Sequence, residues 1–96
     1  MTPEIKTGTY AGTGSLVTVT LGFTPKYLRI LNITDGTETI DFIDTMTAAT
    51  DIKTDTAVAG VTTNGITLTT GGFTVGTDGA ANTSGKTYHY FAIGSN

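Results

Sequence analysis

The chain has 96 residues, a net charge of −3 at pH 7 and no cysteine, and 24 of its residues are threonine. This length suffices for one domain with one modest core, and the five Lys and Arg residues form no cluster that would neutralise a phosphate backbone. No apolar stretch approaches the ~18 residues of a membrane span, so the composition argues against nucleic acid and membrane as partners, and it excludes disulfide frameworks and thiolate metal sites.

The N-terminal third combines a glycine-rich segment with two strand patterns. Residues 7–14 are punctuated by glycine and favour a loop or an irregular edge strand, so we expect residues 1–14 to form a flexible N-terminal arm. Residues 15–21 alternate Val or Leu with Thr, which is typical of a half-buried strand. Residues 26–33 carry apolar side chains on both faces, which predicts a central strand covered on both sides: Leu28 and Ile30 on one face, Leu31 and Ile33 on the other.

Turn signals divide the rest of the chain. Asp35-Gly36 predicts a hairpin whose second strand runs over residues 37–43. Residues 44–63 show no clear alternation and their threonine content disfavours a long helix, so we expect a long irregular loop or a short helix there. After the Asn64-Gly65 turn come three short strands and one polar loop: strands at 66–69, 73–75 and 86–93, with the loop at 76–85.

The close spacing of short strands and turns predicts the fold class. We expect an all-β protein, a small antiparallel β-sandwich or barrel of about six strands. Residues 15–96 form a single domain in this prediction.

Catalytic and metal-binding patterns are weak. The only histidine, His89, lies inside the last strand pattern, and no G-x-S-x-G elbow would expose a serine. Four carboxylates recur every three residues, which on a strand places them alternately on opposite faces and favours a solvated acidic edge over a metal site: Asp35, Glu38, Asp41 and Asp44. No two carboxylates are singled out for glycoside hydrolysis. We therefore predict a protein that is not an enzyme and that binds no cofactor and no metal.

Candidate partner-binding residues lie in three segments. The aromatic side chains of the last strand suit a stacking platform for a sugar or base, or, as we favour, core packing and a subunit interface. The arm at 1–14 and the segment at 44–63 have few packing obligations of their own and can order on a partner. The candidates from these segments are Tyr10, Met46, Ile52, Tyr88 and Tyr90.

The order of short motifs along the chain carries a resemblance. The motifs are Gly8-Thr9-Tyr10-x-Gly12-x-Gly14, Val17-Thr18-Val19-Thr20-Leu21-Gly22-Phe23-Thr24-Pro25-Lys26-Tyr27, Ile30-Leu31-Asn32-Ile33-Thr34-Asp35, Gly65-Ile66-Thr67-Leu68, Gly72-Phe73-Thr74-Val75-Gly76 and Asn82-x-Ser84-Gly85-Lys86-Thr87-Tyr88-His89-Tyr90-Phe91-Ala92. Over nearly the whole chain this order resembles a group of small structural proteins of tailed bacteriophages, such as head decoration (cement) proteins and short fibre modules.

This resemblance implies a non-enzymatic structural protein of the virion. Such a protein would be made in the host cytoplasm, and it would decorate and stabilise the outer surface of the bacteriophage capsid. Its partners would be the major capsid protein and further copies of itself, as a dimer or trimer. Because it would bind only the assembled shell, it would oppose the internal pressure of the genome by mass action.

The C-terminal third is also similar to the H-type lectin domain, a six-stranded sandwich that forms trimers. The matching stretches are Gly72-Phe73-Thr74-Val75 and Tyr88-His89-Tyr90-Phe91-Ala92-Ile93-Gly94. That domain usually carries tryptophan, which this chain lacks. The alternative function is therefore host recognition, as a tail-fibre or lectin-like module that would meet a glycan through Tyr88, Tyr90 or the 76–85 loop.

Overall fold

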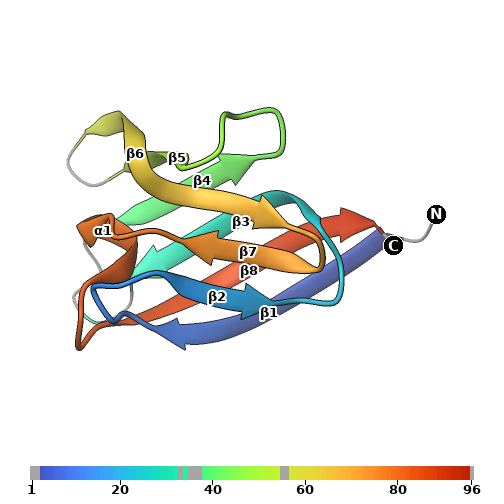
Figure 1. Cartoon of the computed structure of the whole chain (residues 1–96), viewed down its shortest axis with the longest axis horizontal. Coiled ribbons are helices and arrows are strands. Elements are labelled where there is room, and N and C mark those ends of the chain that lie inside the picture. Colours follow the sequence, from blue (N-terminus) through green and yellow to red (C-terminus); the bar gives the residue numbers. More distant parts are fainter. Residues whose placement is uncertain (1–2, 33, 35–37, 55–56, 96) are drawn as a thin grey trace.

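The computed structural model describes residues 3–32, 34, 38–54 and 57–95, which form eight strands and one short helix (Figure 1). All strand pairs are antiparallel. The elements are β1 (Pro3–Ala11), β2 (Val17–Thr20), β3 (Pro25–Asn32), β4 (Thr39–Ile43), β5 (Thr50–Thr54), β6 (Val58–Thr69), β7 (Gly72–Val75), α1 (Gly79–Asn82) and β8 (Thr87–Ser95).

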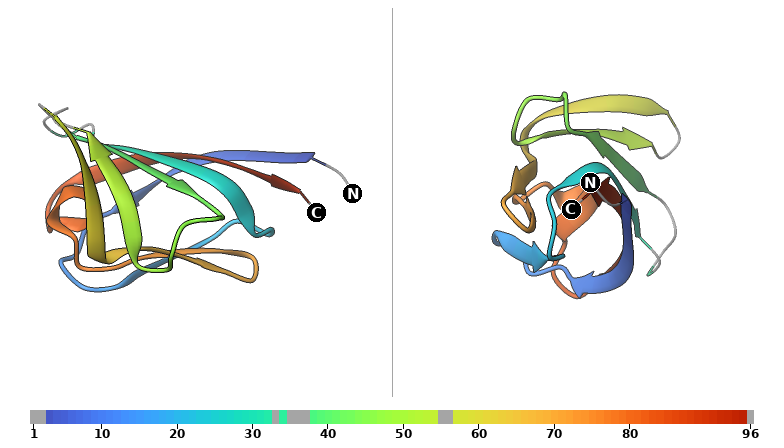
Figure 2. Two further views of the ribbon diagram at one scale, coloured as in Figure 1. Left: turned by 90° about the horizontal axis from the view of Figure 1, so that it is seen from above. Right: turned by 90° about the vertical axis from the view of Figure 1, so that its right-hand side faces the viewer.

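The strands form one sheet in the order β1-β8-β3-β4-β5-β6-β7-β2, which curls on itself into a nearly closed barrel (Figure 2). Among the described residues no pairing joins the two edge strands, β1 and β2. The two chain ends lie side by side, because Pro3 pairs with Ser95, whereas α1 lies at the opposite end of the barrel (Figure 1). This architecture confirms the predicted all-β antiparallel fold.

The core fills the inside of the curled sheet and is rich in aromatic rings. On β8 the alternation turns Tyr88, Tyr90 and Ala92 inward, and each of them is buried. The Tyr10 ring stacks on Tyr88 with centroids 5.3 Å apart, and Phe73 meets Tyr90 edge to face at 5.6 Å. Stacked and edge-to-face pairs of this kind add to the stability that the burial of apolar surface provides.

Three details of the expected fold are corrected. Residues 44–63 are largely strand rather than a long loop, because β5 and the first half of β6 pair with each other there, and the short helix lies at Gly79–Asn82 instead. Residues 3–11 are not a flexible arm, since all of β1 pairs with β8 as an edge strand. The strand β3 is covered on one face only: Leu28 and Ile30 are buried, whereas Leu31 is 41% exposed and Ile33 lies outside the described residues.

Gly72 allows the edge strand β2 to lie close to β7. A Cβ atom at Gly72 would overlap the carbonyl oxygen of Val19. Because this oxygen belongs to the backbone of β2, which is paired with β7, it cannot move aside easily. We therefore expect Gly72→Ala to lower the free energy of unfolding by about 1–3 kcal/mol, measured by urea denaturation. Gly60→Ala is the matched control, because a Cβ there meets nothing within 4 Å. Equal effects of the two substitutions would contradict this account.

Candidate binding surface

The outward side of β1, β8, β3, β4 and β5 carries an unusual number of apolar side chains. Strand register aligns them in rows across the sheet. One row joins Ile5, Ile93, Tyr27 and Ile43. Large exposed apolar groups that adjoin one another mark interaction sites more often than the same groups scattered singly.

A second row runs parallel to the first across the same four strands and continues onto β5. It joins Thr7, Phe91, Arg29, Asp41 and Ile52, and Leu31 follows in the next row. Phe91 is 37% exposed and Ile52 36% exposed, so both offer apolar surface to solvent. We call this surface the outer face and define it as Ile5, Tyr27, Arg29, Leu31, Asp41, Ile43, Ile52, Phe91 and Ile93.

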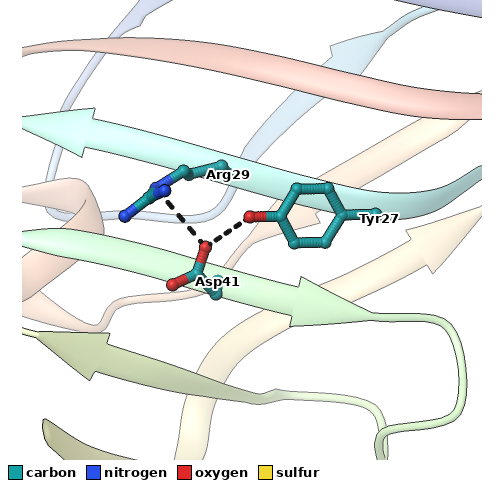
Figure 3. A network of polar contacts seen from close by, with 3 residues as sticks. All are labelled: Tyr27, Arg29 and Asp41. Carbon is teal, nitrogen blue, oxygen red and sulfur yellow. Dashed lines mark hydrogen bonds and ion pairs between the residues drawn. The ribbon is translucent and has the colours of Figure 1, made fainter.

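A small polar network lies in the middle of the outer face (Figure 3). The Tyr27 hydroxyl donates a hydrogen bond to Asp41 Oδ1 at 2.8 Å, and Arg29 Nε lies 3.5 Å from the same oxygen. Partial burial, followed by the hydrogen bond to Asp41, raises the pKa of the Tyr27 phenol. The network fixes three side chains in one orientation, so a partner that docks here meets a preorganised aromatic, cationic and anionic group.

The acidic residues of segment 35–44 do not converge. Asp41 is engaged by Arg29 and Tyr27, and Asp44 lies 3.7 Å from Lys26 Nζ. Asp35 lies outside the described residues, and among those described no three His, Asp or Glu side chains come together as metal ligands. Asp41 therefore belongs to the polar network of the outer face and not to a cluster of metal ligands.

The five predicted partner-binding residues lie in different parts of the molecule. Tyr10, Tyr88 and Tyr90 are core residues, at most 9% exposed, so they offer almost no surface to a partner of the folded chain. Ile52 lies on the outer face. Met46 packs against the edge of the core in a shallow pocket of about 130 Å³ that Phe42, Asp44, Ala48, Thr67 and Leu68 also line.

The outer face includes exposed apolar residues that are not among the five predicted partner-binding residues. These include Leu31, Phe91 and Ile93, of which Phe91 belongs to the aromatic last strand considered for a platform or an interface. No sequence pattern around Arg29 indicates that its side chain takes part in binding. The sequence signal for this surface is the second apolar face of the strands at 26–33 and 86–93, because none of the elements that the structure describes covers that face.

A buried polar cluster lies at the α1 end of the barrel. Asn82 is fully buried and its side chain bonds three backbone groups: Oδ1 accepts from Thr13 N at 2.8 Å, and Nδ2 donates to the carbonyl oxygens of Ser15 and Gly76. The Tyr10 hydroxyl donates to the Ala81 carbonyl at 2.7 Å, and burial raises the pKa of this phenol. This cluster ties the β1–β2 connection to α1, and its polar groups satisfy one another.

Two carboxyl groups near this cluster are not satisfied. Asp51 on β5 is 1% exposed, and neither of its side-chain oxygens has a hydrogen-bond partner. Asp78 caps α1, where its Oδ1 accepts from Ala80 N at 3.1 Å, while its Oδ2 is buried without a partner. Burial raises the pKa of Asp51 to about 7, and smaller contributions come from the negative charge of Asp78 and from the hydrogen bond that Asp51 donates to Asp78 once it is protonated.

The part of the chain described by the structure contains no helix long and apolar enough to cross a membrane. Comparison of the chain with protein-family models, with curated proteins and with solved structures finds no match.

Proposed function

We propose that this chain is a non-catalytic structural protein that docks on a larger protein assembly through its outer face. The assembly that the sequence resemblance favours is the capsid of a tailed bacteriophage. In this proposal the chain binds the major capsid protein on the outside of the virion and stabilises the shell. The observation that carries it is the continuous apolar outer face over five strands.

The chemistry of the outer face fits a protein partner better than a small ligand. Its apolar side chains surround one Tyr, one Arg and one Asp that already bond one another, and interfaces are enriched in aromatic residues and Arg. The outside of a curled sheet is convex and can bury area on a partner of complementary shape, whereas small ligands favour concave sites. In this proposal, self-association into a dimer or trimer would likewise bury exposed apolar side chains.

The residues expected for host recognition give little support to that alternative. Tyr88 and Tyr90 are buried among other core side chains. In the 76–85 loop, Asn82 is fully buried and its amide is engaged by backbone groups, and Asp78 caps α1. A glycan would therefore find neither the aromatic platform nor the acceptor groups that the lectin-like hypothesis required.

The substitution Phe91→Glu tests the docking role. Phe91 is directly opposite Arg29 on β3, so the new carboxylate gains a cross-strand partner and the monomer is expected to keep its stability within about 1 kcal/mol. A charge in the middle of the apolar surface should weaken capsid binding at least tenfold. The measurement is co-sedimentation with purified capsids that lack the protein, together with sedimentation velocity of the free chain.

Leu16→Glu is the matched control for this experiment. Leu16 is 64% exposed but lies in the β1–β2 connection, outside the outer face. It should therefore leave capsid binding unchanged. Saturable binding that Phe91→Glu leaves intact would contradict docking through the outer face, and failure of the unmodified protein to bind capsids would contradict the capsid assignment itself.

A further inference from the structure

We propose that the Asp51 and Asp78 carboxyl groups form a binding site for one calcium ion. The two groups come from separate segments, β5 and the residue preceding α1, and meet beside the Asn64-Gly65 bend of β6. Three of their four oxygens are buried and have no hydrogen-bond partner. Buried polar groups in folded proteins are almost always satisfied, so unpartnered carboxylate oxygens require a proton or a cation between them.

The backbone around the pair holds both carboxyl groups in place. Asp78 N donates to the Asn64 carbonyl at 2.9 Å, Gly76 N donates to the Gly65 carbonyl at 2.9 Å, and Gly65 N donates to the Ala49 carbonyl at 2.9 Å. The register of β5 against β6 shifts between Thr50 and Asp51, and such irregularities redirect side chains. The arrangement is therefore built from three connected segments rather than from one mobile loop.

The backbone of β6 comes close to Asp51 at Gly65. A Cβ atom built on Gly65 would lie 2.8 Å from both Asp51 Oδ2 and the Thr50 carbonyl oxygen. Glycine at this position leaves that space open beside the carboxylate. Carboxylate and carbonyl oxygens are hard ligands, which suit calcium and magnesium rather than softer transition metals.

The charges that face the pair leave it anionic. Lys53 on the same strand lowers the pKa of Asp51 only as the smallest contribution, and neither carboxyl group forms an ion pair with a described residue. The Tyr10 phenol on β1 is neutral, because burial raises its pKa. Two ionised carboxylates would match the charge of one divalent cation. Calcium is favoured over magnesium because it tolerates irregular geometry, whereas magnesium demands a near-ideal octahedron of ligands.

Thermal unfolding of the chelator-treated protein tests the site. At about pH 8, millimolar CaCl2 should raise Tm by on the order of 10 °C if the concentration is a hundredfold above Kd. The shift should be smaller near pH 5, where protons compete for the same oxygens, and MgCl2 should give a smaller shift than CaCl2. Titration calorimetry should give one ion per chain.

Two substitutions distinguish calcium binding at this site from calcium binding elsewhere on the protein. Asp51→Asn and Asp78→Asn each remove one charge with little change in shape, and Asn is as good a helix cap as Asp. Both should abolish the calcium response, whereas Asp44→Asn on the surface should keep it. The proposal is overturned if CaCl2 leaves Tm unchanged, or if either buried variant responds as the unmodified protein does. Neither outcome would affect docking through the outer face.

Discussion

Replacing Asn82 by alanine is expected to lower the free energy of unfolding by about 3–5 kcal/mol. The substitution leaves the amide nitrogen of Thr13 and the carbonyl oxygens of Ser15 and Gly76 without their partner. Each buried polar group left unsatisfied costs about 1–3 kcal/mol. Since small domains have roughly 5–15 kcal/mol in total, the variant should be close to unfolding at physiological temperature.

Urea unfolding followed by circular dichroism measures this loss. The neighbouring Ser84→Ala is the control, because Ser84 is exposed and should change stability by less than about 0.5 kcal/mol. A loss below about 1 kcal/mol for Asn82→Ala would show that water replaces the amide, and the cluster would then not tie the β1–β2 connection to α1.

The second large effect is a fall in stability as the pH rises through neutrality in buffer free of divalent cations. The folded pKa of Asp51, about 7, lies above its unfolded value of 3.8. Between these values the folded state therefore binds more protons than the unfolded state, and stability is lost as the pH rises. The slope reaches about 1.4 kcal/mol per pH unit for one proton, and we expect a total loss of about 2–4 kcal/mol.

The Asp51→Asn variant isolates this contribution. Its amide can donate to Asp78 at any pH, so its stability should change little between about pH 4 and pH 8 and should exceed that of the unmodified protein at the upper end. Chemical denaturation at a series of pH values provides the comparison. A stability that rises with pH in both proteins would refute the shared proton between Asp51 and Asp78.

The strands that sequence reasoning predicted are those with strong alternation. Residues 15–21, 26–33 and 86–93 are rich in Val, Leu, Ile or Tyr, and each overlaps an observed strand. β1 and β5 lack that signal because Thr, Gly and Lys interrupt the apolar pattern of both strands. β1 becomes a strand by pairing with β8, which is distant in sequence, and β5 by pairing with β4 and β6. Local residue propensity does not report on such pairing partners.

The candidate sites were harder to predict than the fold. Alternation separates Tyr88 and Tyr90 from Phe91 and Ile93, but it does not tell which pair faces the core. The outer face becomes visible only when register places Phe91 beside Arg29 and Arg29 beside Asp41. Asp51 lies in a polar stretch that resembles a solvated surface, and its burial results from the irregular pairing of β5 with β6.

The position of β8 between β1 and β3 determines when this chain can fold. Among the described strands β8 comes last in sequence, yet it is the one described partner of β1 and one of the two described partners of β3. Until residues 87–95 have emerged from the ribosome, both strands expose unpaired backbone, and β1 has no ladder to join. The pairing of β1 with β8 joins residues as far apart in sequence as Pro3 and Ser95, so folding should be a slow, single event that requires residues 87–95.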